Sequence, residues 1–473
     1  MNTFTYNMVV RIIKYILFTT TFIFFFLFDL TLGSSVRTST NSKVEISIDN
    51  NDNSIINNVI DSTLFNKRFD SRIERFSRYW HLAGASIAIA YKGNIVHAKG
   101  YGYANKETQE PVEPHNLFRI ASVSKLITAV AVMKLVEDSK LSLNQKVFGK
   151  EGILNDTIFS SYIDERVEQI TVRQLLNHSA GWTTRWGDHL FMPESIARQM
   201  NLELPVSKDN IIQFALSKRL HFTPGSRSSY NNLGYTILER VIEKVSLESY
   251  ESFVKSNVFA PIGVNDAFIA HNYDSLRYPF EVRYYEVPEA DSVPAFDGSS
   301  QLVLKSRGGN DVRTLGAAGG WVISSVSLLK FILAIDPENN SNQIISIKSA
   351  KELIEKEQGK HPLGWRWVAS DGSKWRTGSF AGTSALALAR SDGFTFVFLT
   401  NTSPWVGSKF PYEVNRMMAK ALGVMESDVQ ELFASKNSLP INKSGEIQNF
   451  ILSDSVTKPW NYLDILTLGS TSN

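Results

Sequence analysis

The 473-residue chain contains no cysteine. Disulfide bonds, cysteine-ligated iron–sulfur clusters, cysteine zinc sites and a cysteine nucleophile are therefore excluded. The chain also has little net charge, because 49 Lys and Arg side chains face 47 Asp and Glu side chains. Nucleic-acid binders usually carry a clustered basic face, so we expect no nucleic-acid partner.

The N-terminal hydrophobic run is too short to cross a bilayer comfortably. It covers residues 15–28, whereas a spanning helix needs roughly 20 apolar residues. Arg11 and Lys14 precede the run, and Asp29 and then small residues follow it. This order is typical of a signal peptide, which we place at residues 1–34. The protein is therefore expected to be exported, either periplasmic or secreted. Without cleavage, the same segment would anchor it to a membrane.

The rest of the chain divides by composition. Hydrophobic residues make up 43% and charged residues 20%, so a core can form. Residues 35–69 are mostly polar and rich in Asn, Ser, Thr and Asp, which indicates a linker. Residues 70–425 form the expected catalytic body, and residues 426–473 form a polar C-terminal tail.

Hydrophobic periodicity and turn signals place strands at both ends of the body and helices between them. The predicted elements are a β-hairpin over 85–91 and 95–99, a long buried helix from Ser122 to Val136, helices over 211–216 and 233–245, and a second hairpin over 384–390 and 394–400. Hairpins make a sheet antiparallel. The sequence therefore predicts an α+β fold, with an antiparallel sheet flanked by helices and an inserted, mostly helical subdomain.

The first candidate motif is Ser122-x-x-Lys125, at the start of the long helix. Residues three apart on a helix share a face, so the amine can reach the hydroxyl. A hydroxyl is a weak nucleophile without an adjacent base, and a lysine in a dry pocket near another cation has a lowered pKa and can be that base. The competing interpretation is a serine cap followed by a solvated lysine.

The second candidate motif is Tyr230-x-Asn232, which precedes the helix over 233–245. A phenol can shuttle protons if nearby cations lower its pKa, and an amide side chain can hydrogen-bond an amide substrate. The competing interpretation is a helix-capping asparagine beside a packed tyrosine.

The third candidate motif, Arg376-Thr377-Gly378-Ser379, lies near the beginning of a strand. Gly378 would let a substrate approach the strand backbone closely. The competing interpretation is a plain edge strand with a glycine bulge.

In this order, the three motifs resemble the signature of the serine β-lactamase and penicillin-binding-protein-like superfamily. The branch concerned contains class C β-lactamases, D-aminopeptidases, DD-carboxypeptidases and esterases, and its signature is Ser-x-x-Lys, Tyr-x-Asn, then Lys- or His-x-Gly. Three further segments resemble family elements, namely 84–102, 171–181 and 319–325. The resemblance covers roughly residues 70 to 425 and implies a β-lactamase/transpeptidase-like fold.

The resemblance implies roles for the motif residues. Ser122 would be the acylated nucleophile, Lys125 would take or stabilise its proton, and Tyr230 would pass the proton to the leaving group. The backbone N–H groups of Ser122 and Ser379 would form the oxyanion hole. Substrate would be bound by Asn232 and by the stretch Arg376, Thr377, Gly378 and Ser379.

One position departs from the family pattern, because Arg376 stands where the signature has lysine or histidine. Arginine keeps the positive charge and offers a planar fork for a carboxylate, but it cannot donate a proton at ordinary pH. We therefore hypothesise that Arg376 binds a substrate carboxylate or holds Tyr230. His178 is interpreted as structural, since its loop resembles the family scaffold.

The implied activity is that of an exported serine hydrolase that needs no metal or cofactor. Its partner would be a small-molecule or peptide substrate, such as a D-amino-acid peptide of cell-wall type, a small ester or a β-lactam. Efficient β-lactam hydrolysis is the least expected of these, because of Arg376. The alternative is a catalytically silent member that binds a peptide or cell-wall component. The sequence leaves the oligomeric state open.

Overall fold

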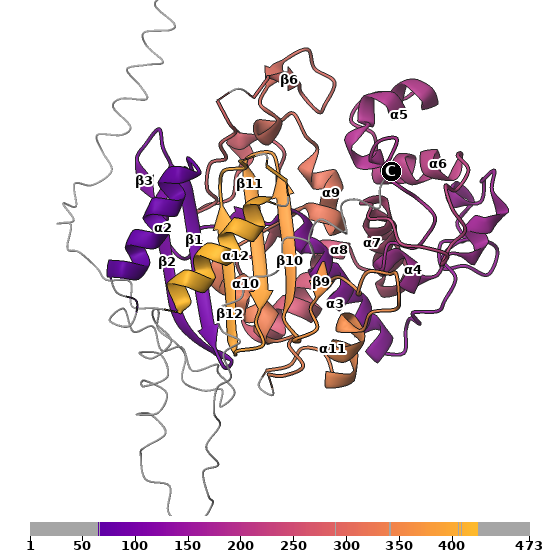
Figure 1. Cartoon of the computed structure of the whole chain (residues 1–473). Helices are drawn as coiled ribbons and strands as arrows, with labels where there is room; N and C mark the ends of the chain where they lie inside the picture. Colours follow the sequence, from indigo (N-terminus) through magenta and orange to yellow (C-terminus); the bar gives the residue numbers. More distant parts are fainter. Residues whose placement is uncertain are drawn as a thin grey trace, which may run out of the picture. The chain divides into compact units, whose positions relative to one another are not determined.

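The computed structural model describes residue 65 and residues 67–423, except residues 289, 340, 341, 405 and 408 (Figure 1). The expected signal peptide over 1–34, nearly all of the polar linker and the whole tail over 426–473 lie outside the described residues. Among the described helices, none is long and apolar enough to cross a membrane.

A seven-stranded sheet is built from the two ends of the body, and its paired strands are antiparallel. In spatial order the strands are β3 (Glu110–Pro111), β2 (Asn94–Asn105), β1 (Gly84–Tyr91), β12 (Phe394–Thr400), β11 (Thr383–Ala389), β10 (Lys374–Phe380) and β9 (Trp367–Val368). Both predicted hairpins are present, and the pairing of β1 with β12 joins them. The predicted fold class is confirmed.

Side-chain alternation explains the two faces of the sheet. In β1 the large residues Ile87 and Ile89 belong to one buried cluster, while Ala88 and Ala90 belong to the other. The large-residue face is covered by α2 (Lys67–Tyr79) and α12 (Lys409–Leu422), which lie side by side in Figure 1. On the alanine face, small side chains allow α10 (Ser325–Leu333) to pack against β1, β11 and β12.

Most of the remaining helices lie between the two strand groups in the sequence. They are α3 (Ser124–Glu137), α4 (Val172–Leu176), α5 (Pro193–Met200), α6 (Lys208–Leu216), α7 (Leu233–Ser246), α8 (Tyr250–Val254), α9 (Val312–Gly319) and α11 (Ile347–Ile354). Two small sheets accompany them, β4 (Phe118–Arg119) with β8 (Trp321–Ile323) and β5 (Phe268–Ile269), and β6 (Val293–Pro294) with β7 (Leu302–Val303).

The long predicted helix begins two residues later than expected. Residues Ala121–Val123 form a 3-10 turn, η1, and the α-helix α3 starts at Ser124. Ala121 has a φ of 45°, a left-handed conformation that is uncommon for a residue with a Cβ atom. This turn joins β4 to α3 and contacts β10, so it sets the position of Ser122.

A buried hydrogen-bond network fixes α3 against the strand that follows α9. The Tyr250 hydroxyl lies 2.8 Å from Thr128 Oγ1 and accepts a hydrogen bond from Trp321 Nε1 at 2.9 Å. Thr128 Oγ1 also donates to the Ala317 carbonyl at 2.7 Å. The three side chains tie together α3, α8 and β8, the elements that support the nucleophile turn.

Replacing Tyr250 by phenylalanine should destabilise the fold by about 1–3 kcal/mol, because the buried Trp321 N–H would lose its acceptor. The free energy of unfolding in urea measures the effect. Tyr79→Phe is the control, since Tyr79 is 75% exposed. Equal stability of the two variants would contradict a stabilising role for the network.

Candidate active site

Ser122 contacts both predicted partners from the motifs. Its Oγ atom accepts hydrogen bonds from the Tyr230 hydroxyl at 2.8 Å and from Lys125 Nζ at 3.3 Å. The serine is half-buried on η1, and Tyr230 reaches it from the loop before α7. The structure therefore brings together three residues that come from two distant segments of the chain.

Lys125 is buried on α3, so the interpretation as a solvated lysine is wrong. Besides Ser122, its Nζ atom donates to Asn232 Oδ1 and to the Ala318 carbonyl, each at 2.6 Å. The three protons of an ammonium group thus have three acceptors. Burial lowers the pKa of Lys125, and the nearby Arg376 charge acts in the same direction.

Tyr230 lies among cations. Burial on its own would raise the pKa of the phenol, but the charges of Lys125 and Arg376, with the hydrogen bond to Ser122, outweigh burial and lower it to about 7. Arg366 adds a third cation, a guanidinium whose central carbon lies 5.1 Å from the centre of the Tyr230 ring. The phenol can therefore exchange a proton near neutral pH.

Arg376 is buried on β10 and contacts the Ser122 backbone and the Tyr230 side chain. Its Nε atom donates to the Ser122 carbonyl at 2.8 Å, and Nη2 donates to the Tyr230 hydroxyl at 3.3 Å. Of the two expected roles, the geometry provides the contact with Tyr230. Because the guanidinium is turned inward to Ser122 and Tyr230, the geometry gives no support to binding of a substrate carboxylate.

Asn232 has a different partner from the one expected. Its Oδ1 atom accepts from Lys125, and its Nδ2 atom donates to Asp188 Oδ2 at 2.8 Å. A carboxylate can only accept, so Asp188 fixes which end of the amide faces the lysine. Both ends of Asn232 are engaged within the protein. Asn232 therefore positions Lys125, and its side chain does not cap α7. An amide has two N–H donors and two acceptor positions, so the expected role in orienting substrate stays a prediction.

Sequence reasoning missed Asp188. It lies in a loop 44 residues before Asn232 and belongs to no motif of the signature. Its Oδ1 atom accepts from the Leu190 N–H at 3.1 Å and so caps η4 (His189–Phe191). No pattern in the sequence links this loop to Ser122, because the link depends on the tertiary contact with Asn232.

The free edge of β10 runs beside the nucleophile turn. Trp375 accepts a hydrogen bond from the Arg366 N–H, so its peptide groups point away from β11. Peptide direction alternates along an antiparallel strand, and therefore Thr377 and Ser379 point the same way. Among the described strands, β9 pairs with this edge only as far as Trp375. The Ser379 N–H thus points to the free edge of β10, and the turn that carries Ser122 contacts the same strand. The oxyanion hole of Ser122 and Ser379 stays a prediction.

Gly378 serves the protein backbone instead of the substrate. A Cβ atom at this position would lie 2.1 Å from the Ile120 carbonyl oxygen and 3.1 Å from the Ser122 nitrogen. The glycine therefore allows η1 to pack against β10, which corrects the expectation that it admits a substrate. The strand carries no bulge here, because the register from Lys374 to Phe380 is continuous.

His178 forms part of the wall behind Tyr230. The two ring centres are 4.5 Å apart, and His178 Nδ1 accepts from the Asn231 N–H at 3.5 Å. Burial lowers the pKa of His178 well below its usual value, with the nearby His361 contributing. Its described hydrogen bonds include none to Ser122, so the geometry provides no serine–histidine pair.

Comparison with known proteins places this geometry in a family. A family model described as Beta-lactamase matches residues 69–414, which is more than half of the chain. The chain belongs to the Beta-lactamase family. The resemblance inferred from the three motifs is thereby confirmed, and this Beta-lactamase-like family is one of serine hydrolases.

Curated relatives of this Beta-lactamase family member match over part of their length. Protein flp of Staphylococcus aureus (strain NCTC 8325 / PS 47) is 27% identical over 211 residues, which are 44% of this chain and 39% of that protein. Penicillin-binding protein 4* of Bacillus subtilis (strain 168) is 28% identical over 207 residues, 43% of this chain and 41% of that protein. The matched segments thus span about two fifths of these relatives.

Solved structures share the fold. The octameric penicillin-binding protein homologue from Pyrococcus abyssi has a TM-score of 0.57 and 25% identity, covering 76% of this chain and 77% of its own. The D-amino acid amidase from Ochrobactrum anthropi SV3, complexed with D-phenylalanine, has a TM-score of 0.60 and 20% identity, covering 77% of this chain and 99% of its own.

Asp188→Asn should lower kcat/KM for p-nitrophenyl acetate about 10- to 100-fold, because the charge-assisted hydrogen bond that orients Asn232 is lost. The pH profile should also change, since Asp188 raises the pKa of Lys125. Asp156→Asn is the control, because Asp156 pairs with Lys244 in an exposed ion pair. An unchanged rate and profile in the Asp188 variant would rule out this positioning role.

Proposed function

We propose that the protein hydrolyses an amide or ester through an acyl-enzyme on Ser122. The observation that carries the proposal is the double contact of Ser122 Oγ with Tyr230 and Lys125, inside a buried group of cations that lowers the pKa of Tyr230 to about 7. A hydroxyl nucleophile needs an adjacent base, and an ionised phenol at hydrogen-bond distance is one.

Tyr230 acts as the base in this mechanism. Its phenolate takes the proton from Ser122 while the serine oxygen forms a bond to the carbonyl carbon of the substrate. Lys125 remains a cation, because each of its three protons already has an acceptor, and it stabilises the phenolate. This assigns the lysine the second of its two expected roles, stabilising the proton transfer instead of accepting the proton.

The negative charge that develops on the carbonyl oxygen is held by two backbone N–H groups, those of Ser122 and Ser379. Each such donor contributes about 10²–10³ to the rate in well-studied hydrolases. When the tetrahedral intermediate collapses, the bond to the leaving group breaks and Tyr230 returns its proton to that group. Water, deprotonated by Tyr230, then attacks the acyl-enzyme. The bond between the carbonyl carbon and Ser122 Oγ breaks, Tyr230 returns the proton to that oxygen, and the acid is released.

The proposed substrates are D-amino-acid amides or peptides and small esters, in preference to β-lactams. The fold shared with a D-amino acid amidase and with penicillin-binding protein homologues supports this choice. The reaction uses only side chains and backbone of this chain, so we propose no cofactor. We propose no nucleic-acid partner either, because the chain has little net charge. Export is proposed from residues 1–34 alone, which lie outside the described residues.

A serine-reactive phosphonate probe should label the full-length protein at Ser122, as mass spectrometry of the peptides would show. Ser122→Ala should abolish the adduct and reduce hydrolysis of p-nitrophenyl acetate at least about 10³-fold. Ser160→Ala is the control, because Ser160 is exposed and its hydroxyl contacts its own turn. A folded protein that forms no adduct would favour the alternative, a silent member that only binds a peptide or cell-wall component.

The pH dependence tests the role of Tyr230. Because the active form is the phenolate, kcat/KM should rise with pH through about 7 and then level off. Arg376→Gln removes a neighbouring cation and should move this rise upward by about one to three pH units, whereas Arg376→Lys should leave it near neutral pH. The same profile in both variants would exclude Arg376 as the source of the lowered pKa.

A further inference from the structure

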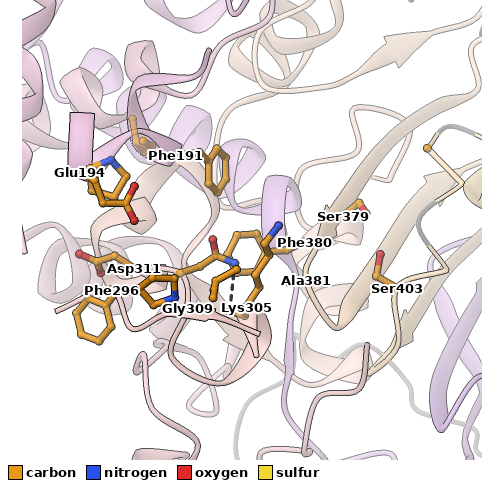
Figure 2. Close-up of a pocket in the computed structure, with 16 residues that line it drawn as sticks. Phe191, Glu194, Phe296, Lys305, Gly309, Asp311, Ser379, Phe380, Ala381 and Ser403 are labelled. Carbon is orange, nitrogen blue, oxygen red and sulfur yellow. Dashed lines mark hydrogen bonds between the residues drawn. The ribbon is translucent and has the colours of Figure 1, made fainter. Parts of the chain in front are cut away.

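A large cavity opens beside Ser379, at the end of β10 opposite Arg376. It has a volume of about 680 Å³ and is bounded by the η4 turn with the start of α5, the β6–β7 region and the segment before α9. In Figure 2, Ser379 and Ser403 stand at one end of the labelled side chains, and Glu194 and Phe296 stand at the other. Of the residues that line the cavity, Ser379 alone belongs to one of the three sequence motifs.

Aromatic side chains from three separate segments form the walls. Phe191 comes from η4, Phe296 from the turn after β6, and Phe380 from the end of β10. The Phe191 and Phe380 ring centres are 6.0 Å apart. Phe191 is 46% exposed, although phenylalanine is normally buried. Exposed apolar surface inside a concave site is typical of a surface that a ligand covers.

The polar groups of the lining partly serve the protein itself. Asp311 accepts hydrogen bonds from the Thr314 N–H and hydroxyl and so caps α9. Asn310 Nδ2 donates to the Lys305 carbonyl at 3.1 Å, which fixes the loop between them. These contacts fix the side chains of Asn310 and Asp311. The lining also includes Glu194 and Lys305, and the three aromatic rings supply its apolar surface.

The direction of β10 decides which part of a substrate would enter. Arg376, which contacts Tyr230, marks one end of the site. Ser379 and Phe380 follow it on β10, and Phe380 lies about 13 Å along the strand from Arg376. In the proposed mechanism Tyr230 protonates the leaving group, so the leaving group lies at the Arg376 end. The carbonyl oxygen lies at the Ser379 N–H, and therefore the acyl part continues toward Phe380 and the cavity.

We propose that this cavity binds the acyl part of the substrate and selects bulky apolar acyl groups, with an aromatic group as the preferred occupant. A cavity of about 150 Å³ holds benzene. The space here is several times larger, so it fits an acyl group that extends beyond a single amino-acid side chain. The inference rests on the proposed function, because it uses Tyr230 to define the leaving-group side.

The test compares p-nitrophenyl esters of acetic acid and 4-phenylbutyric acid on the full-length protein. The unaltered chain should have the higher kcat/KM for the phenylbutyrate ester. Phe191→Ala should lower the ratio of kcat/KM for phenylbutyrate to kcat/KM for acetate about 10-fold. Trp186→Ala is the matched control, since Trp186 is a 65% exposed aromatic residue in the same loop but outside the cavity. It should change neither rate.

Binding separates this inference from the proposed function. In Ser122→Ala, which cannot be acylated, calorimetry should detect 4-phenylbutyrate, and adding Phe191→Ala should weaken its binding about 10-fold. The protein could hydrolyse the acetate ester, show no preference for the phenylbutyrate ester and fail to bind 4-phenylbutyrate. This result would overturn the cavity assignment while the proposed function stood. Binding of the acid at the cavity without hydrolysis of either ester would overturn the function, and with it the acyl-side assignment, while showing an aromatic-acid site.

Discussion

The site depends on two positive charges that the fold keeps away from water. Lys125 and Arg376 are both buried, and in the part of the chain that the structure describes neither forms an ion pair with a carboxylate. Burying an unpaired charge is costly. The group that can supply a negative charge in contact with the cluster is the Tyr230 phenol, and this explains why its pKa is lowered to about 7 although burial opposes ionisation.

The fold places these charges by joining distant segments. The nucleophile turn η1 lies between β4 and α3, while Arg376 arrives on a strand from the other end of the body. Gly378 permits the close contact between them, since a Cβ atom would overlap the Ile120 carbonyl. The Ser122 peptide is therefore held by Arg376 through its carbonyl and packed against Gly378 of β10.

The secondary structure was largely predictable because local patterns dominate it. Hydrophobic periodicity and turn signals identified both hairpins, and helical spacing identified α6 and α7. The start of α3 was misplaced by two residues, since η1 is shaped by contacts with β10 and β11 and not by periodicity. The contacts of Asn232 and Gly378 within the protein were not predicted either, because their neighbours come from other segments.

The sequence by itself determined the family, the antiparallel α+β fold and the set of reactive groups, because these follow from residue types in a fixed order. It also showed that arginine stands where the family has lysine or histidine. Tertiary structure alone decided the inward direction of Arg376, the link from Asp188 to Lys125 and the aromatic cavity beside Ser379. These features depend on distance and desolvation, and such quantities are set only when segments more than a hundred residues apart pack together.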